Sequence, residues 1–207
     1  MPQYGEGRAK NQRNMYVVGA YKKQLLDLLR LNNDFQQALL HQEFPEPNQY
    51  EINKINKSYF KEYVYDHAFV PGTTTEERIF VCMEITNPYS DGITFKELCI
   101  QIFVFTPKMS VQWKSDEEVT AQEILEQRGY IGNKIDMVVD IIDRQINGLE
   151  HLSLGKITLN QRDGLKIFSY VDGYYGKQLT YTARDFNLLP PSALHENYRD
   201  GKPDYDE

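Results

Sequence analysis

The sequence predicts an α+β fold, in which an antiparallel or mixed β-sheet carries an N-terminal helix and a long amphipathic helix packed on it. Two observations predict it. Apolar residues recur at helical spacing in two separate stretches, and apolar or aromatic runs bounded by Gly, Pro, Asn and Asp lie between and after them. The expected order is helix, paired strands, polar segment, amphipathic helix and C-terminal β-meander.

The first helical stretch covers residues 16–40, where apolar side chains recur every three or four positions. Asn32, Asn33 and Asp34 interrupt it, which predicts the end of one helix and the start of a second, short one, because Asn and Asp compete for backbone hydrogen bonds. The proline-containing segment 41–56 is predicted to be a surface loop.

The strand predictions rest on β-branched and aromatic runs. Asn87–Gly92 joins the two most apolar strands as a hairpin-type loop, and Asp163-Gly164 and Asp172-Gly173 predict tight turns within the meander. Continuous apolarity further predicts that both faces of the central strands are covered, one by a helix and the other by a second helix or another subunit. The predicted strands are Tyr59–Val70, Arg78–Thr86, Glu97–Thr106, Lys156–Asn160, Leu165–Val171 and Tyr174–Thr182.

The second helix has the strongest pattern in the chain. Asn133 is predicted as its N-cap with Asp136 three residues on, and Asn147-Gly148 as its stop. A weaker helical pattern covers Ala121–Gln127 within the polar segment that precedes it. The predicted buried stripe of the second helix consists of Ile131, Ile135, Val138, Val139, Ile142 and Ile146.

Length and composition predict a single domain. The chain has 207 residues, 41% hydrophobic and 26% charged, which is ordinary globular usage. Residues 15–189 form the predicted domain, residues 1–14 a flexible basic arm, and residues 190–207 an acidic extended tail. The arm has no apolar core of a signal peptide, and no stretch is long enough to span a bilayer. We therefore expect no membrane association.

Charge and cysteine content exclude several function classes. A net charge of −7 argues against broad binding to nucleic acid or to anionic membranes. Cys82 and Cys99 each lie in an apolar run, so we expect reduced, packed thiols, with a disulfide between neighbouring strands as the alternative.

No combination of residues predicts catalysis, a bound cofactor or a metal centre. Phosphate-binding glycine motifs and a nucleophile elbow are absent, and the four histidines are scattered, so that His67 is expected to be an exposed residue near a strand end. Glu84 and Glu97 are the acidic candidates for a metal-dependent nuclease, although a salt bridge explains Glu84 more simply. Asp140, Asp143 and Arg144 are predicted to form a solvated helix face.

The order of elements, together with the segment from the Asn133–Asn147 helix through Gly155–Leu159 and Gly173–Tyr181 to Asp185–Asn187, resembles the tail terminator and tail-completion proteins of tailed bacteriophages. The likeness is strongest over residues 131–187. The resemblance implies a structural virion protein assembled in the host cytoplasm. It implies a homo-oligomeric ring, usually sixfold, at the neck or tail, with neighbouring neck and tail proteins as partners and DNA passing through the channel without specific binding.

Within such a ring, two groups of contact residues are expected. Phe80, Ile102 and Phe103 are the candidate subunit-interface residues, because a ring contact covers apolar surface that an isolated subunit exposes. The basic arm, with Arg8, Lys10 and Arg13, is the candidate strap onto a partner, and the acidic tail is a second one.

Three alternatives remain open from the sequence. A head–tail connector or stopper protein has a similar size and also forms rings. A small nuclease would use Glu84 and Glu97 as metal ligands. A monomeric adaptor would use the tyrosine-rich segment 50–70 as its contact surface.

Overall fold

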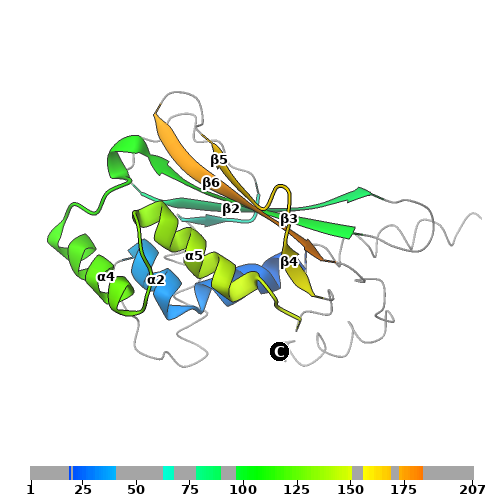
Figure 1. Cartoon of the computed structure of the whole chain (residues 1–207), viewed down its shortest axis with the longest axis horizontal. Helices are drawn as coiled ribbons and strands as arrows, with labels where there is room; N and C mark the ends of the chain where they lie inside the picture. Colours follow the sequence, from blue (N-terminus) through cyan, green and yellow to red (C-terminus); the bar gives the residue numbers. More distant parts are fainter. Residues whose placement is uncertain are drawn as a thin grey trace, which may run out of the picture.

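The computed structural model describes residues 19, 21–40, 63–67, 78–89, 97–150, 156–168 and 173–183. In these residues a mixed β-sheet forms one layer, and the helices form a second layer on one of its faces (Figure 1). The predicted α+β fold class is confirmed. The basic arm 1–14, the acidic tail 190–207 and the predicted loop 41–56 lie outside the described residues, so those predictions stay predictions.

The sheet has the strand order β1-β2-β3-β6-β4, with β5 also paired to β6. β1 is parallel to β2, and all the other pairs are antiparallel. The long central pairs β2–β3 and β3–β6 form most of the ladder. The strands are β1 (Val64–Tyr65), β2 (Phe80–Tyr89), β3 (Glu97–Pro107), β4 (Ile157–Leu159), β5 (Leu165–Phe168) and β6 (Tyr174–Ala183).

The meander differs from the prediction in how its first two strands pair. β4 and β5 do not form a hairpin at Asp163-Gly164. Both pair with β6, β4 opposite residues 181–183 and β5 opposite residues 176–179, so they lie end to end along one edge of β6. Thr180 explains this arrangement, because its carbonyl accepts from the Asn160 N–H and its N–H donates to the Gly164 carbonyl, at 2.8 Å each. The turn between β4 and β5 is therefore a bulge in one edge strand.

β2 is longer than predicted. It continues past Thr86 to Tyr89, through Asn87 and Pro88, with a register shift between Thr86 and Tyr89. A proline cannot donate to a ladder but is tolerated at a bulge or an edge, which accounts for a strand that runs through a predicted loop.

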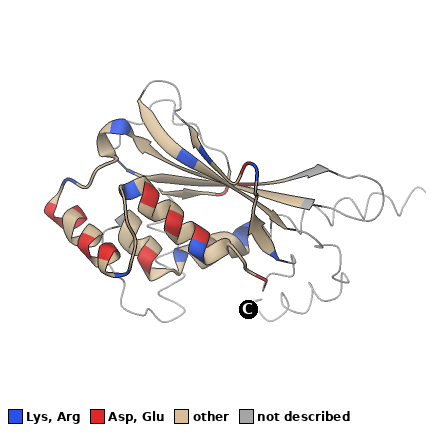
Figure 2. Ribbon diagram, in the orientation of Figure 1, with Lys and Arg blue, Asp and Glu red and all other residues tan. Residues whose placement is uncertain are grey.

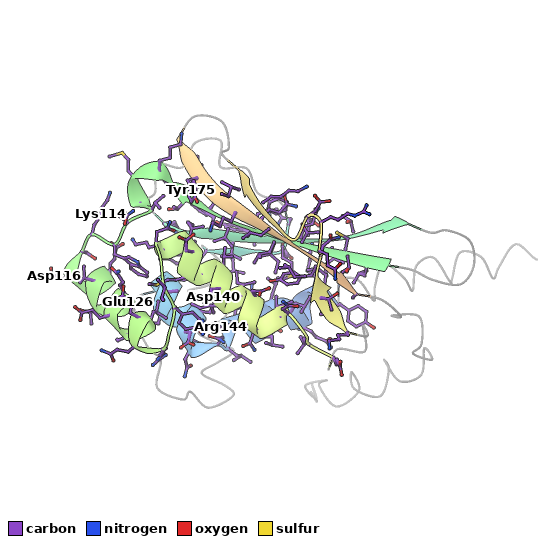
Figure 3. All side chains as sticks on the ribbon, in the orientation of Figure 1. Lys114, Asp116, Glu126, Asp140, Arg144 and Tyr175 are labelled. Carbon is purple, nitrogen blue, oxygen red and sulfur yellow. The ribbon has the colours of Figure 1, made fainter. Side chains whose placement is uncertain are left out.

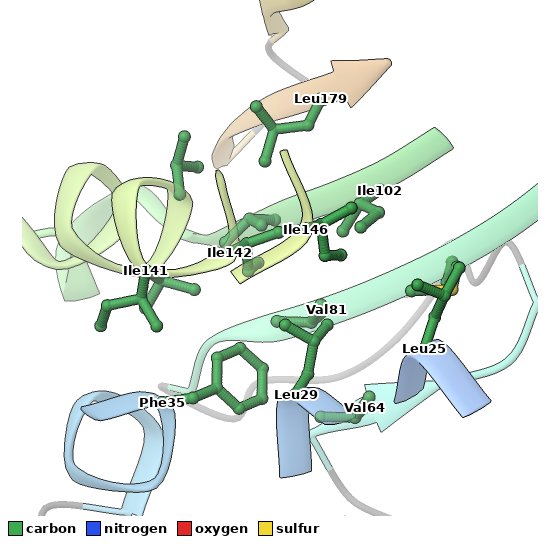
Figure 4. Close-up of a cluster of buried hydrophobic side chains, with 14 of the residues drawn as sticks. Leu25, Leu29, Phe35, Val64, Val81, Ile102, Ile141, Ile142, Ile146 and Leu179 are labelled. Atoms are coloured by element: carbon green, nitrogen blue, oxygen red, sulfur yellow. The ribbon is translucent and has the colours of Figure 1, made fainter. Parts of the chain in front are cut away.

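The main core lies between the sheet and the helices (Figure 4). Alternate strand residues point into it, because successive side chains of a strand face opposite sides. On β3 these are Leu98, Ile100, Ile102 and Val104, each with no exposed surface. The helices supply the other half of the core with Leu25, Leu29, Phe35, Ile135, Val138, Ile142 and Ile146.

The helix predicted around 131–147 is α5 (Lys134–Ile146). Its predicted cap is confirmed: the Asn133 side chain accepts from the Asp136 N–H, and the Asp136 carboxylate accepts from the Asn133 N–H. Ile131 is a correction, since it is 84% exposed instead of buried. The helix begins only after it, and Gly132, at a φ of 123°, turns the chain away from the stripe.

The remaining helices follow the predicted pattern with adjusted ends. Residues 21–30 are helical, and α2 (Asn33–Leu40) begins after Asn32, whose side chain accepts from the Phe35 N–H at 2.9 Å. The weak helix predicted at Ala121–Gln127 is the longer α4 (Asp116–Gln127), begun by a capping box at Ser115. A short 3-10 turn, η3 (Lys108–Ser110), follows β3.

Candidate functional site

Glu84 lies in an ion pair. The Nζ atom of Lys22, on the N-terminal helix, lies 3.0 Å from its carboxylate and also donates to the Asp66 carbonyl. Glu84 pairs with Gln101 in the β2–β3 ladder, and Glu97 lies four positions further along β3. At the rise of a strand, four positions correspond to about 13 Å along the sheet. The simpler explanation of Glu84, a salt bridge, is confirmed.

An open pocket of about 420 Å³ lies beside this ion pair. Its lining combines Lys22, Lys23 and Arg30 with Leu26, Val64 and Asp66. The cations are offset by acids, because Lys22 pairs with Glu84, Arg30 lies 3.3 Å from Asp27, and Asp66 of the lining balances the charge of Lys23. The pocket therefore carries no strong charge that would select a ligand.

His67 is exposed just beyond β1, as predicted, and its Nδ1 atom lies 2.9 Å from the Asp66 carboxylate. That hydrogen bond lowers the pKa of Asp66. Within the described ranges, no three His, Cys, Asp or Glu side chains come together to hold a metal ion.

The two cysteines are both free thiols. Cys82 is buried and Cys99 is half-buried. Their strand positions explain why they do not bond, since Cys82 pairs with Phe103 whereas Cys99 pairs with Thr86, four residues away along β2. The expectation of reduced thiols is confirmed, and the disulfide alternative is wrong.

The polar side of α5 carries Asp140 and Arg144 (Figure 3) and contributes an ion pair and a partly buried hydrogen bond. The Arg144 guanidinium lies 2.7 Å from the Asp140 carboxylate, and its central carbon lies 4.3 Å from the centre of the Tyr130 ring. Asp143 is not simply solvated, because it accepts a 3.0 Å hydrogen bond from the hydroxyl of Tyr181, a fully buried residue of β6. Burial raises the pKa of Tyr181 above its ordinary range, and Asp143 adds to that effect. Asp143 thus helps to fix α5 on the sheet.

Tyr130 joins α2 to the segment between α4 and α5. Its hydroxyl donates to the Asp34 carboxylate at 2.6 Å, and Arg128 lies 2.5 Å from the same carboxylate. Burial, followed by the hydrogen bond to Asp34, raises the pKa of Tyr130 to about 12. The Tyr130 hydroxyl therefore stays protonated and keeps its hydrogen bond to Asp34.

The three candidate interface residues lie on different faces of the sheet. Ile102 has no exposed surface and lies in the core beneath the helices. Phe80, at 1% exposure, forms a second cluster on the opposite face with Cys82 and Phe105, and half-buried Phe103 packs against this cluster. Of the three, only Phe103 offers surface to a partner. Arg8, Lys10 and Arg13 lie outside the described residues.

The strongest candidate for a contact is the outer edge of β5. Leu165 is 51% exposed and Ile167 69% exposed, within the strand that the sequence predicts here as part of the meander. The N–H of Thr180 donates to the Gly164 carbonyl, so Gly164 and every second residue after it turn their backbone groups toward β6. Leu165 and Ile167 therefore turn theirs outward, where no described residue bonds to them.

This edge differs in charge from the helical layer. Lys156 directly precedes β4, Arg162 lies in the turn between β4 and β5 together with the acid Asp163, and Lys166 lies on β5. In contrast, α4 carries five acids and no base (Figure 2). Lys166 lies 2.8 Å from Asp163, and both side chains are more than half exposed. A lysine between two apolar residues is typical of edge strands. That pattern was the sequence signal available for this edge.

A family model gives an independent comparison. Residues 23–183 match the model of the YomW family, from the N-terminal helix to the end of β6. The chain belongs to the YomW family. This family is phage-derived, from the SPBeta region of Bacillus phage, so the phage origin implied by the sequence resemblance is confirmed.

A search of the curated proteins finds no match to the chain. Among the described residues, no helix has both the length and the apolarity that crossing a membrane requires.

Proposed function

We propose that this protein of a phage-derived family is a structural component of the virion. It assembles into a closed ring of six copies, in the manner of tail terminators and tail-completion proteins, at the neck or tail. DNA passes through the central channel, and neighbouring neck and tail proteins are its partners. The observation that carries the proposal is the β5 edge, where two exposed apolar side chains coincide with outward-facing backbone groups.

Such an edge favours assembly over an isolated monomer. Monomeric proteins normally protect sheet edges with charge, proline or a covering segment, because an open edge is a template for pairing with another chain. β5 has one lysine, but its two apolar side chains stay in solvent. A subunit contact removes both from water and satisfies the outward backbone groups.

The charge of the chain supports the proposed channel. A wall that binds phosphate tightly would hold DNA in place, whereas a chain with a net charge of −7 repels it and lets a duplex slide. The contacts described around Glu84, Asp143 and Tyr130 further favour a structural over a catalytic role, since each ionisable group is used to join elements.

A head–tail connector or stopper is the second candidate, because it uses the same kind of ring at an adjacent position. Mixing the purified protein with isolated tails or with filled heads separates the two. A tail terminator binds the tail end first, and a stopper binds the head.

Native mass spectrometry with and without magnesium tests the ring itself. We expect a closed oligomer whose subunit count does not depend on the metal. Ile167→Lys should weaken it, and the matched variant Ile131→Lys should not, because Ile131 is 84% exposed but lies in the segment before α5 and not on a strand of the sheet. A monomer that binds magnesium stoichiometrically would support the nuclease alternative. A bare monomer would contradict self-assembly and favour the adaptor.

A further inference from the structure

Among the residues that the structure describes, the other edge of the sheet has a stretch without a neighbouring strand. β1 pairs only with Val81 and Cys82 of β2, so residues 85–89 of β2 have no neighbouring strand among the described residues. The N–H of Val81 donates to Tyr63 on the outer side, so the backbone groups of Ile85, four residues on, also face outward. Thr86 is exposed there.

We propose that the β5 edge of one copy pairs, antiparallel, with this open stretch of β2 in a second copy. The inference rests on the proposed function and names the contact that would build the ring. Because the two edges are different surfaces of the chain, the contact is head-to-tail and leaves one open edge at each end of any dimer. Such contacts close into a ring when the rotation between copies allows it.

Strand direction supports this pairing. Along the sheet, β2, β3, β6 and β5 alternate in direction, since each neighbouring pair is antiparallel. A β2 strand of the next copy, placed beside β5 in the same orientation, continues this alternation. The helices of both copies then lie on the same side of one continuous sheet, so no helix blocks the contact.

Side-chain faces also match at this contact. With Lys166 opposite Thr86, the outward-facing backbones of Ile167 and Ile85 form a hydrogen-bonded pair, and both side chains lie on the helix-covered face. Leu165 lies on that face too, so two side chains that are half or more exposed join an apolar layer. On the opposite face Lys166, which is paired with Asp163, comes diagonally across from Glu84, which is paired with Lys22, so the contact brings two neutral ion pairs together.

Charge disfavours the simplest competing arrangement. A twofold pairing of β5 with β5, centred on Lys166, would place the two copies' Lys166 side chains directly opposite each other. Like charges at opposed positions destabilise a strand pair. The pairing with β2 instead places Lys166 opposite Thr86, which carries no charge, and this favours the unlike edge.

Disulfide trapping between copies tests the register. In a non-hydrogen-bonded antiparallel pair the Cα atoms lie about 4.5 Å apart, within the range of a disulfide. Lys166→Cys and Thr86→Cys are made in separate proteins, mixed, and oxidised with copper phenanthroline. Both carry Cys99→Ser, because Cys99 pairs with Thr86 inside each chain and would capture the new thiol.

The expected result is a covalent heterodimer from the mixture, about tenfold above a control mixture with Lys156→Cys in place of Lys166→Cys, because only Lys166 lies opposite Thr86 at disulfide distance. Lys156 is a suitable control because its side chain is 61% exposed but lies at the start of β4. A dimer from Lys166→Cys alone would establish the twofold pairing and overturn the proposal.

The mass of the unmodified protein distinguishes a failure of the β5–β2 contact from a failure of the proposed ring. A closed oligomer whose mixed variants give no heterodimer would overturn the β5–β2 contact and leave the ring standing. A monomer without any heterodimer would overturn both.

Discussion

Lys134 is the most deeply buried cation of the described residues, and its replacement gives the sharpest test of how the helical layer is held together. Its side chain is 5% exposed, forms an ion pair with Glu118 of α4, and lies 5.4 Å above the ring centre of Trp113. The Glu118 carboxylate also accepts from the N–H groups of Lys114 and Ser115, at 2.6 and 3.2 Å. The pair thus joins the start of α4 to the start of α5.

The magnitude follows from the pKa of Glu118. Burial alone would raise it, but the hydrogen bonds from Lys134 and from the two backbone N–H groups outweigh burial and lower the pKa to about 2, from an ordinary 4.5. A shift of this size corresponds to about 3 kcal/mol, at about 1.4 kcal/mol per unit. Lys134→Met keeps the two backbone hydrogen bonds, and solvent screens part of the rest because 16% of the Glu118 side chain remains exposed. We therefore expect the substitution to lower the free energy of unfolding by about 2 kcal/mol at most.

Urea unfolding of the wild type and of Lys134→Met measures this cost at neutral pH. For a chain of this size, about 2 kcal/mol corresponds to a fall in Tm of about 4–8 °C. The matched control is Lys156→Met, which removes an exposed pair with Glu150, at 3.8 Å, and should cost less than about 0.5 kcal/mol.

The stability that the Lys134–Glu118 pair contributes should change with pH in a defined direction. A lowered folded-state pKa stabilises the native state above the unfolded value of Glu118, and this stability is lost as the pH falls toward the folded value. The difference between wild type and Lys134→Met should therefore shrink between about pH 5 and about pH 3. An equal cost for both lysine variants, or a difference that stays constant on acidification, would refute the reasoning.

Two further substitutions test the packing of α5. Tyr181→Phe should lower the free energy of unfolding by about 1–2 kcal/mol, because it removes the hydrogen bond to Asp143; a change below about 0.3 kcal/mol in urea unfolding would mean that this bond contributes nothing. Gly132→Ala should lower the free energy of unfolding by at least about 1 kcal/mol more than Gly129→Ala does. Both glycines have positive φ, but only at Gly132 would the new Cβ meet another side chain, 2.7 Å from the Asp136 Cβ, so equal melting temperatures would contradict this account.

Local pattern predicted most of the secondary structure. Neighbouring residues determine the α5 cap at Asn133 and Asp136, the long apolar strands and the break at Asn32, because capping and periodicity are short-range effects. Ile131 was placed wrongly for the same reason. Its spacing fits the stripe, but a helix start is decided by the cap, two residues later.

Pairing between distant strands was not predictable in the same way. The sequence alone determined that the chain is an α+β domain with reduced thiols and a buried stripe on α5, because these depend on residue type and spacing. Only the tertiary structure decided that β4 and β5 share one edge of β6, that Glu84 is held by Lys22, and that Leu165 and Ile167 stay in solvent. An apolar strand looks the same in sequence whether a neighbour covers it or not, and which residues it meets depends on chain segments far away along the sequence.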